Sequence, residues 1–99
     1  MSSNTLVNPV LDKMQQLTYS DDSIYEFFSL ANKAYLLIYT QGIDGKQAYL
    51  DKLKLVIERQ IRPLLEEDLT RKEKQDLFKT AKTNFEAQLK AYSKYKKSS

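Results

Sequence analysis

The fold of this chain follows from residues 20–39, SDDSIYEFFSLANKAYLLIY. The first four residues of this segment are favoured as helix N-caps, and the two carboxylates suit the positive end of a helix dipole. Apolar residues then recur at steps of three and four, which is the period of an α-helix. Only Glu26, Ser29 and Lys33 form a clear polar strip. We therefore predict a helix at about residues 22–40 that is covered on several sides. Its expected main stripe is Ile24, Phe27, Phe28, Ala31, Tyr35 and Ile38.

The same period predicts a helix before this segment and another near the end of the chain. The first spans about residues 5–18, with Asn8-Pro9 suited to an N-cap followed by the first helical residue. The last begins at Thr70-Arg71-Lys72-Glu73, the sequence of a capping box. It spans about residues 70–95, and the segment after it either extends the helix or frays.

A further helix is predicted at about residues 45–67. Gly42 stands where a left-handed residue would end the preceding helix. Pro63 has no N–H to donate to the carbonyl of Arg59, and its ring crowds that turn. We therefore expect a kink or an early helix end at Pro63.

Four amphipathic helices joined by short loops predict an all-α fold, an antiparallel four-helix bundle with a short basic C-terminal tail. Residues 1–99 suffice for one domain with a single hydrophobic core. We expect the core to contain Phe28, Ala31, Tyr35, Ile38, Leu53, Ile57, Ile61, Phe78, Ala81, Phe85 and Leu89.

The composition limits the chemistry that this chain can perform. Its 99 residues include no Cys and no His. Their absence excludes disulfides, Cys/His zinc sites, and Ser–His–Asp or Cys–His catalysis. The acidic clusters lack the spacing of a calcium-binding loop, and no sequence feature places a carboxylate pair in a cleft. We therefore expect no metal, no cofactor and no enzymatic activity.

The sequence contains no signal peptide or membrane span that we can identify. Residues 1–10 have neither a basic start nor an apolar run. The longest uninterrupted apolar run, residues 34–39, is far shorter than a membrane span. The lack of Cys also fits a reducing compartment. We expect a cytoplasmic protein.

Positive charge is concentrated toward the C-terminal end. Lys and Arg number 16 against 13 Asp and Glu, a net charge of +3, and residues 79–97 hold six lysines but a single acid, Glu86. Basic residues interleaved with tyrosines suit a membrane interface, a nucleic acid or a protein groove, and equally suit a solvated helix end. The candidate partner-binding residues are Lys90, Tyr92, Lys94, Tyr95, Lys96 and Lys97.

The order of elements from Tyr19 to Tyr92 resembles the bacteriocin immunity proteins of the enterocin A and pediocin-like group. The resemblance covers about three quarters of the chain. It is carried by a short first helix, the aromatic-rich residues 24–39, a long third helix ending around Gln60-Ile61-Arg62, an acidic loop, the capping box with Leu69 before it, and the Leu77/Phe78 stripe.

This resemblance implies an antiparallel four-helix bundle that protects a cell from a pore-forming antimicrobial peptide without catalysis. Such proteins act from the cytosolic side on the membrane receptor, the mannose phosphotransferase permease, or on the toxin–receptor complex. Their C-terminal half selects the bacteriocin, which here corresponds to the chain after Pro63. No family motif selects individual binding residues, so the six candidates rest on charge and position. A basic end also suits peripheral contact with the anionic cytoplasmic leaflet.

The alternative function is that of a small basic helical module that binds nucleic acid or regulates a protein partner. The sequence has no recognisable helix-turn-helix, and a charge of +3 is weak for phosphate binding. We therefore expect no nucleic-acid partner. Salt-dependent retention on DNA separates the two functions, because only the alternative requires it.

Overall fold

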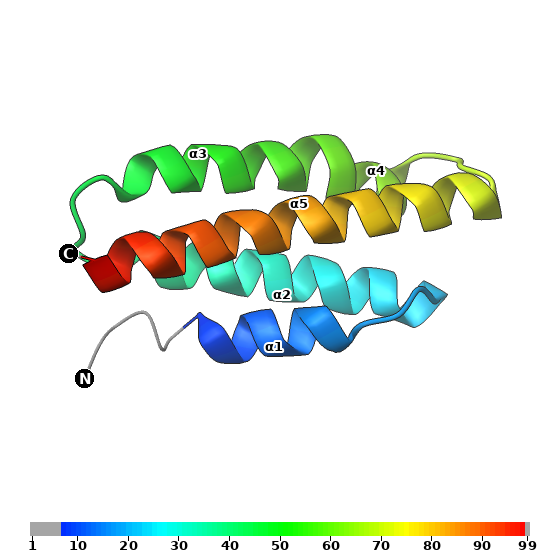
Figure 1. The fold of residues 1–99 in the computed structure, drawn as a ribbon. Helices are drawn as coiled ribbons and strands as arrows, with labels where there is room; N and C mark the ends of the chain where they lie inside the picture. Colours follow the sequence, from blue (N-terminus) through cyan, green and yellow to red (C-terminus); the bar gives the residue numbers. More distant parts are fainter. Residues whose placement is uncertain (1–6, 99) are drawn as a thin grey trace.

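The computed structural model describes the backbone of residues 7–98 and the side chains of residues 7–95. The described chain is all-α, as predicted, and its helices form an antiparallel four-helix bundle (Figure 1). The helical segments are α1 (Asn8–Gln16), α2 (Asp21–Tyr39), α3 (Lys46–Val56), the π-helical turn η2 (Ile57–Ile61), α4 (Arg62–Glu66) and α5 (Arg71–Ser98). Three of these, α3, η2 and α4, follow one another without a loop and form the third helix of the bundle. The basic C-terminal end is a continuation of α5.

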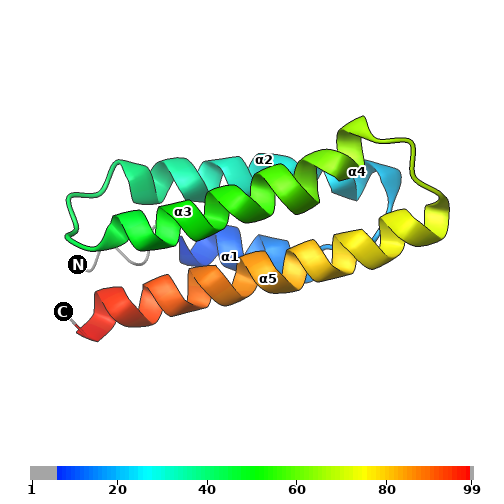
Figure 2. The same cartoon turned by 90° about the horizontal axis from the view of Figure 1, so that it is seen from above.

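The helices are arranged so that α2 and α5 lie at opposite edges of the bundle (Figure 2). The α5 helix packs against α1 on one side and against α3 and η2 on the other. The α2 helix packs between α1 and α3. Because α1 has only nine residues and α2 has nineteen, α1 covers α2 over only part of its length.

Most of the predicted core residues are buried, but Phe28 and Tyr35 are only half-buried. The row of α2 that faces the core is Ile24, Phe27, Ala31, Ala34 and Ile38. Phe27 is completely buried, and its ring makes edge-to-face contacts with Phe78 at 5.4 Å and Phe85 at 6.4 Å. The prediction was wrong for these two residues because two neighbouring rows of α2 are both apolar, and helical periodicity alone does not choose between them.

The predicted capping box is confirmed at the start of α5. The Glu73 N–H donates to Oγ1 of Thr70 at 3.2 Å, and the Thr70 N–H donates to Oε1 of Glu73 at 2.9 Å. Hydrogen bonding to the backbone N–H of Thr70, and to a smaller extent to its side chain, lowers the pKa of the Glu73 carboxyl. At α2, Ser20 is the N-cap, and its hydroxyl accepts from the Ser23 N–H at 3.1 Å.

Two predicted helix boundaries are corrected by the structure. Asn8 is the first residue of α1 rather than its N-cap; the cap is Val7, whose side chain makes no capping hydrogen bond. The predicted start at residue 5 lies outside the described residues. Gly42 is not left-handed, whereas Gly45, the N-cap of α3, has φ +86°. The turn therefore takes its left-handed residue at the start of the next helix, where glycine has no Cβ to clash.

The third helix neither ends at Pro63 nor passes it in regular α-helical form. Before the proline the backbone widens into the π-helical turn η2, in which the Arg62 N–H donates to the carbonyl of Ile57. Pro63 is the second residue of α4, so the N–H that it lacks falls directly after the π-helical turn, where the regular hydrogen-bond pattern has already changed. A π-helical turn is one of the recognised causes of an irregular helix.

Candidate functional site at the C-terminal end of α5

The last turns of α5 lie against the loop of residues 40–45 that joins α2 to α3 (Figure 1). Two tyrosines of α5 make this contact. The Tyr92 hydroxyl donates to the side-chain carbonyl oxygen of Gln41, and the Tyr95 hydroxyl donates to the backbone carbonyl of Asp44 at 2.5 Å. The basic end of the helix is therefore fixed to the bundle at two points.

Tyr92, which the sequence analysis named as a candidate partner-binding residue, does not lie at the surface. Its side chain is completely buried, at the end of the core row of α5 that contains Phe85 and Leu89. Burial, and to a smaller extent the nearby Tyr95, raises the pKa of Tyr92 above its ordinary value. The prediction that Tyr92 binds a partner is corrected: this ring is a core residue that anchors the loop.

Tyr95 is half-buried, and its ring packs beside the start of α3. Tyr49 of α3 lies between the two tyrosines of α5, with ring centroids 5.6 Å from Tyr92 and 5.4 Å from Tyr95. A Cβ atom added at Gly45 would overlap the Tyr95 hydroxyl. Glycine is therefore required at residue 45 both by its positive φ and by the approach of Tyr95.

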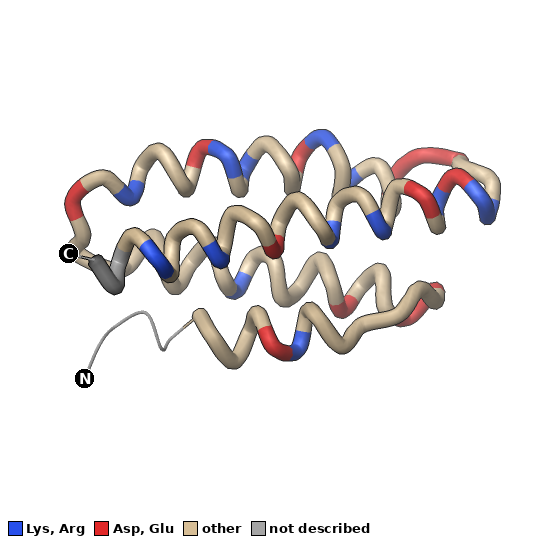
Figure 3. The backbone as a smooth tube through the Cα atoms, in the orientation of Figure 1, with Lys and Arg blue, Asp and Glu red and all other residues tan. Residues whose placement is uncertain are grey.

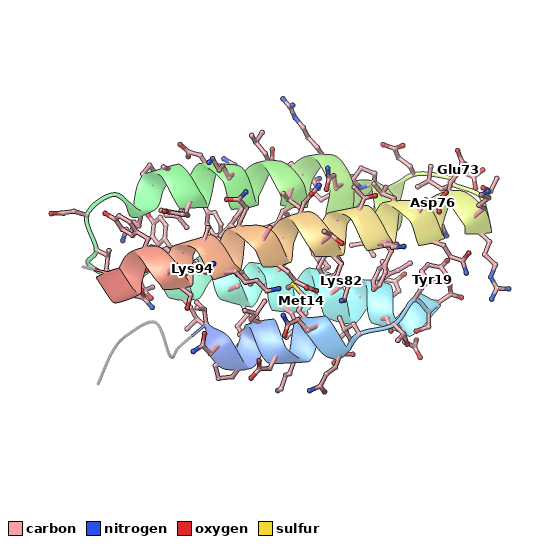
Figure 4. All side chains as sticks on the ribbon, viewed as in Figure 1. Met14, Tyr19, Glu73, Asp76, Lys82 and Lys94 are labelled. Carbon is pink, nitrogen blue, oxygen red and sulfur yellow. The ribbon has the colours of Figure 1, made fainter. Side chains whose placement is uncertain are left out.

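Lys90 and Lys94 are exposed on α5, four residues apart on one face of the helix. Figure 3 shows that basic positions follow one another toward this end of α5 and that no acidic position comes after Glu86. Figure 4 labels Lys94 near the end of the helix. The side chains of Lys96 and Lys97 lie outside the described residues, although their backbone continues α5. Among the described candidates, the structure therefore leaves Lys90, Lys94 and part of Tyr95 at the surface.

Lys46 is a basic residue of this end of the bundle that the sequence analysis missed. It is the first residue of α3, where the helix dipole disfavours a cation. Its ammonium group instead donates to the backbone carbonyls of Tyr39, at 2.6 Å, and Gln41 at the C-terminal end of α2. A cation is favoured at a helix C-terminus. The position of this lysine, directly after the glycine that begins a helix, is the sequence feature that could have indicated its role.

Side chains of α5 also fix the helix to α1. Lys82 forms an ion pair with Glu86 at 2.8 Å and donates to the carbonyl of Gln15 at the end of α1, at 3.3 Å. Figure 4 shows Lys82 on the side of α5 that faces α1, near Met14. The Ser93 hydroxyl donates to Oδ1 of Asn8 at 3.4 Å. Both Lys82 and Glu86 are largely shielded from solvent, so they contribute little to the basic surface.

Within the described part of the chain, no group of three or more acidic residues is placed to hold a metal ion. No helix among the described residues has the length and apolarity that crossing a bilayer requires. The chain matches no protein-family model, no curated protein and no solved structure.

Proposed function

We propose that this protein is a bacteriocin immunity protein, which protects a cell from a pore-forming antimicrobial peptide by binding and not by catalysis. In this proposal it acts in the cytoplasm, at the inner face of the membrane, on the sugar-transport receptor or on the receptor–toxin complex. Two features support the proposal: the resemblance between Tyr19 and Tyr92, and the four-helix bundle that this resemblance implies.

The observation that carries the proposal is the pair of exposed lysines, Lys90 and Lys94, on a helix end that is held in place. Tyr92 and Tyr95 anchor that end to the α2–α3 loop, so the two charges are presented by an ordered element. Ordered charged groups on a surface guide association and discriminate between partners without any reaction chemistry. The negative cytoplasmic leaflet adds a further attraction for a basic helix end.

A charge-reversal experiment tests this function. Lys94, Lys96 and Lys97 are replaced together with Glu, and sensitive cells expressing the variant are exposed to the bacteriocin. We expect reduced survival together with wild-type helicity and melting temperature, because these residues follow the buried core row of α5, and substitutions away from a core usually change stability by less than about 0.5 kcal/mol. Lys90→Gln and Lys94→Gln, which remove charge without reversing it, should give a smaller loss of protection.

A second triple variant supplies the control. Lys13, Lys52 and Arg59 are exposed basic residues that precede Pro63, and replacing them with Glu changes the net charge by the same amount. We expect this control to protect as well as the wild type. Full protection by the C-terminal variant, or an equal loss in both variants, would contradict the proposed site. Salt-dependent retention of the wild type on DNA would favour the nucleic-acid alternative.

A further inference from the structure

The α2 helix carries two rows of residues with the spacing of a coiled coil. The buried row is Ile24, Phe27, Ala31, Ala34 and Ile38. One residue further along runs a second row, here called the outer row, which consists of Tyr25, Phe28, Asn32, Tyr35 and Tyr39. Both rows advance by three, four, three and four residues, which is the a/d spacing that buries a helix against a partner helix. Within the described chain the first row is buried, whereas the outer row is covered only in part, at Phe28, Asn32 and Tyr35.

The outer row leaves large apolar side chains at the surface. Tyr25 is 67% exposed and Tyr39 59%, and Leu36, which lies beside the row, is 59% exposed. Phe28 and Tyr35 are half-buried, and the ring of Tyr35 stacks on that of Tyr39. Since a tyrosine or phenylalanine offers about 150–250 Å² of surface, these side chains together expose roughly 500 Å². Patches of that size on a single protein are often functional.

We propose that a second copy of this chain covers the outer row, with the two α2 helices antiparallel about a two-fold axis at Asn32. The pattern is self-complementary about that residue. Tyr25 is seven residues before Asn32 and Tyr39 seven after it, while Phe28 and Leu36 are four residues on either side. Tyr25 then faces Tyr39 of the second copy and Phe28 faces Leu36, while Tyr35 faces Ser29. Asn32 faces Asn32, an arrangement in which one buried polar residue fixes the register.

The charges at the two ends of the outer row favour a second copy of this chain as the partner and favour an antiparallel arrangement of the two α2 helices. Asp21 is exposed and continues the outer row, four residues before Tyr25. At the other end of the row the ammonium of Lys46 lies 5.7 Å from the centre of the Tyr39 ring. An antiparallel pair places Asp21 at the Lys46 end of the second copy, and it sets the helix dipoles in opposite directions. A parallel pair would place Asp21 against Asp21.

The space beside the outer row and its total area also fit a second copy. A groove of about 440 Å³ lies between α2 and the third helix and is lined on the α2 side by Phe28, Asn32 and Tyr35. Leu36 of a second copy, which lies opposite Phe28, is positioned to enter it. Two copies would bury about 1,000 Å² from the patch alone, which is about the area that a specific interface needs. The proposal is independent of the proposed function.

Sedimentation equilibrium of the full chain over a range of concentrations tests the association. We expect the wild type to form dimers and Leu36→Glu to weaken association by about thirtyfold, since a central apolar contact is replaced by a charge. Leu55→Glu is the matched control, because Leu55 is 48% exposed on α3 and lies outside the outer row. A wild type that is monomeric at about 100 µM, or equal effects of the two substitutions, would overturn the proposal.

Cross-linking tests the antiparallel register, which is simple here because the chain has no natural cysteine. Under mild oxidation, Asn32→Cys should form a covalent dimer with itself, because residue 32 lies on the axis. Tyr25→Cys should not react with itself but should react when mixed with Tyr39→Cys. Efficient self-cross-linking of Tyr25→Cys would show a parallel pair, and the absence of cross-linking at all three positions would show that no such pair forms. Either result overturns the proposed arrangement.

Discussion

Two adjacent phenylalanines of α2 allow a sharp test of how this helix is oriented. Phe27 is completely buried and contacts the rings of Phe78 and Phe85, whereas Phe28 is half-buried on the outer row. The two residues have the same side chain and are neighbours in the same helix, so replacement by Ala changes the helix propensity equally at both positions. The Ala variants of the two therefore differ mainly in the cavity that each leaves.

Removal of a fully buried Phe costs about 3–5 kcal/mol, from the lost transfer free energy and the unfilled cavity. We expect Phe27→Ala to fall in this range, because its ring contacts two other core rings. Phe28→Ala should cost less than about half as much, since solvent already reaches the ring and water fills the space that it leaves. A small domain has only about 5–15 kcal/mol of total stability, so Phe27→Ala should be close to unfolding.

Urea denaturation followed by circular dichroism measures both effects. With a slope of about 1–3 kcal/mol/M, the Phe27→Ala midpoint should fall by roughly 2 M, and the slope itself should stay constant. Both variants are measured at one low protein concentration, so that association through the outer row does not contribute. A cost for Phe28→Ala equal to or greater than that for Phe27→Ala would show that α2 is rotated by about one residue from the orientation described here.

Three further predictions concern single contacts. Thr70→Ala should destabilise the protein by about 0.5–2 kcal/mol and speed amide exchange at residues 71–73, because a helix-start N–H loses its acceptor; equal exchange rates in both proteins would show that the cap contributes nothing. The raised pKa of Tyr92 means that the folded protein holds the phenol proton more tightly than the unfolded chain does. The stability gained in this way is complete below the pKa of Tyr in the unfolded chain, and it is lost as the pH rises above about 10. Tyr92→Phe should lower stability near neutral pH by about 1–3 kcal/mol, because Gln41 loses a donor, and should reduce this alkaline loss; denaturation at a series of pH values measures both. Gly45→Ala should destabilise by at least about 1–2 kcal/mol from its left-handed backbone alone, whereas Gly42→Ala, where an added Cβ meets nothing within 4 Å, should be close to neutral in thermal melts. Similar melting temperatures for the two glycine variants would contradict the structure of the α2–α3 turn.

Local chemistry made much of the fold predictable from the sequence. The capping box was identified because Thr70 and Glu73 are three residues apart and satisfy each other's backbone N–H groups without help from the rest of the chain. The four helices were identified because apolar residues at steps of three and four form a stripe that must be buried. Lys90 and Lys94 were placed at the surface correctly, since charged side chains are rarely buried without a partner.

The tertiary structure decided what depends on residues far apart in the chain. Periodicity allowed either of two apolar rows of α2 to face inward, and only the surrounding helices select the one that contains Phe27. The lysines around Tyr92 suggested a partner-binding role, but its ring is completely buried in the core row of α5, and its hydroxyl donates to Gln41, fifty-one positions earlier. The sequence predicted that Pro63 would disturb the third helix, but it did not predict which irregularity would result. The helix widened into a π-helical turn and continued, because Ile61 and Leu64 on either side of the proline are buried in the core, and their burial outweighs the irregular backbone.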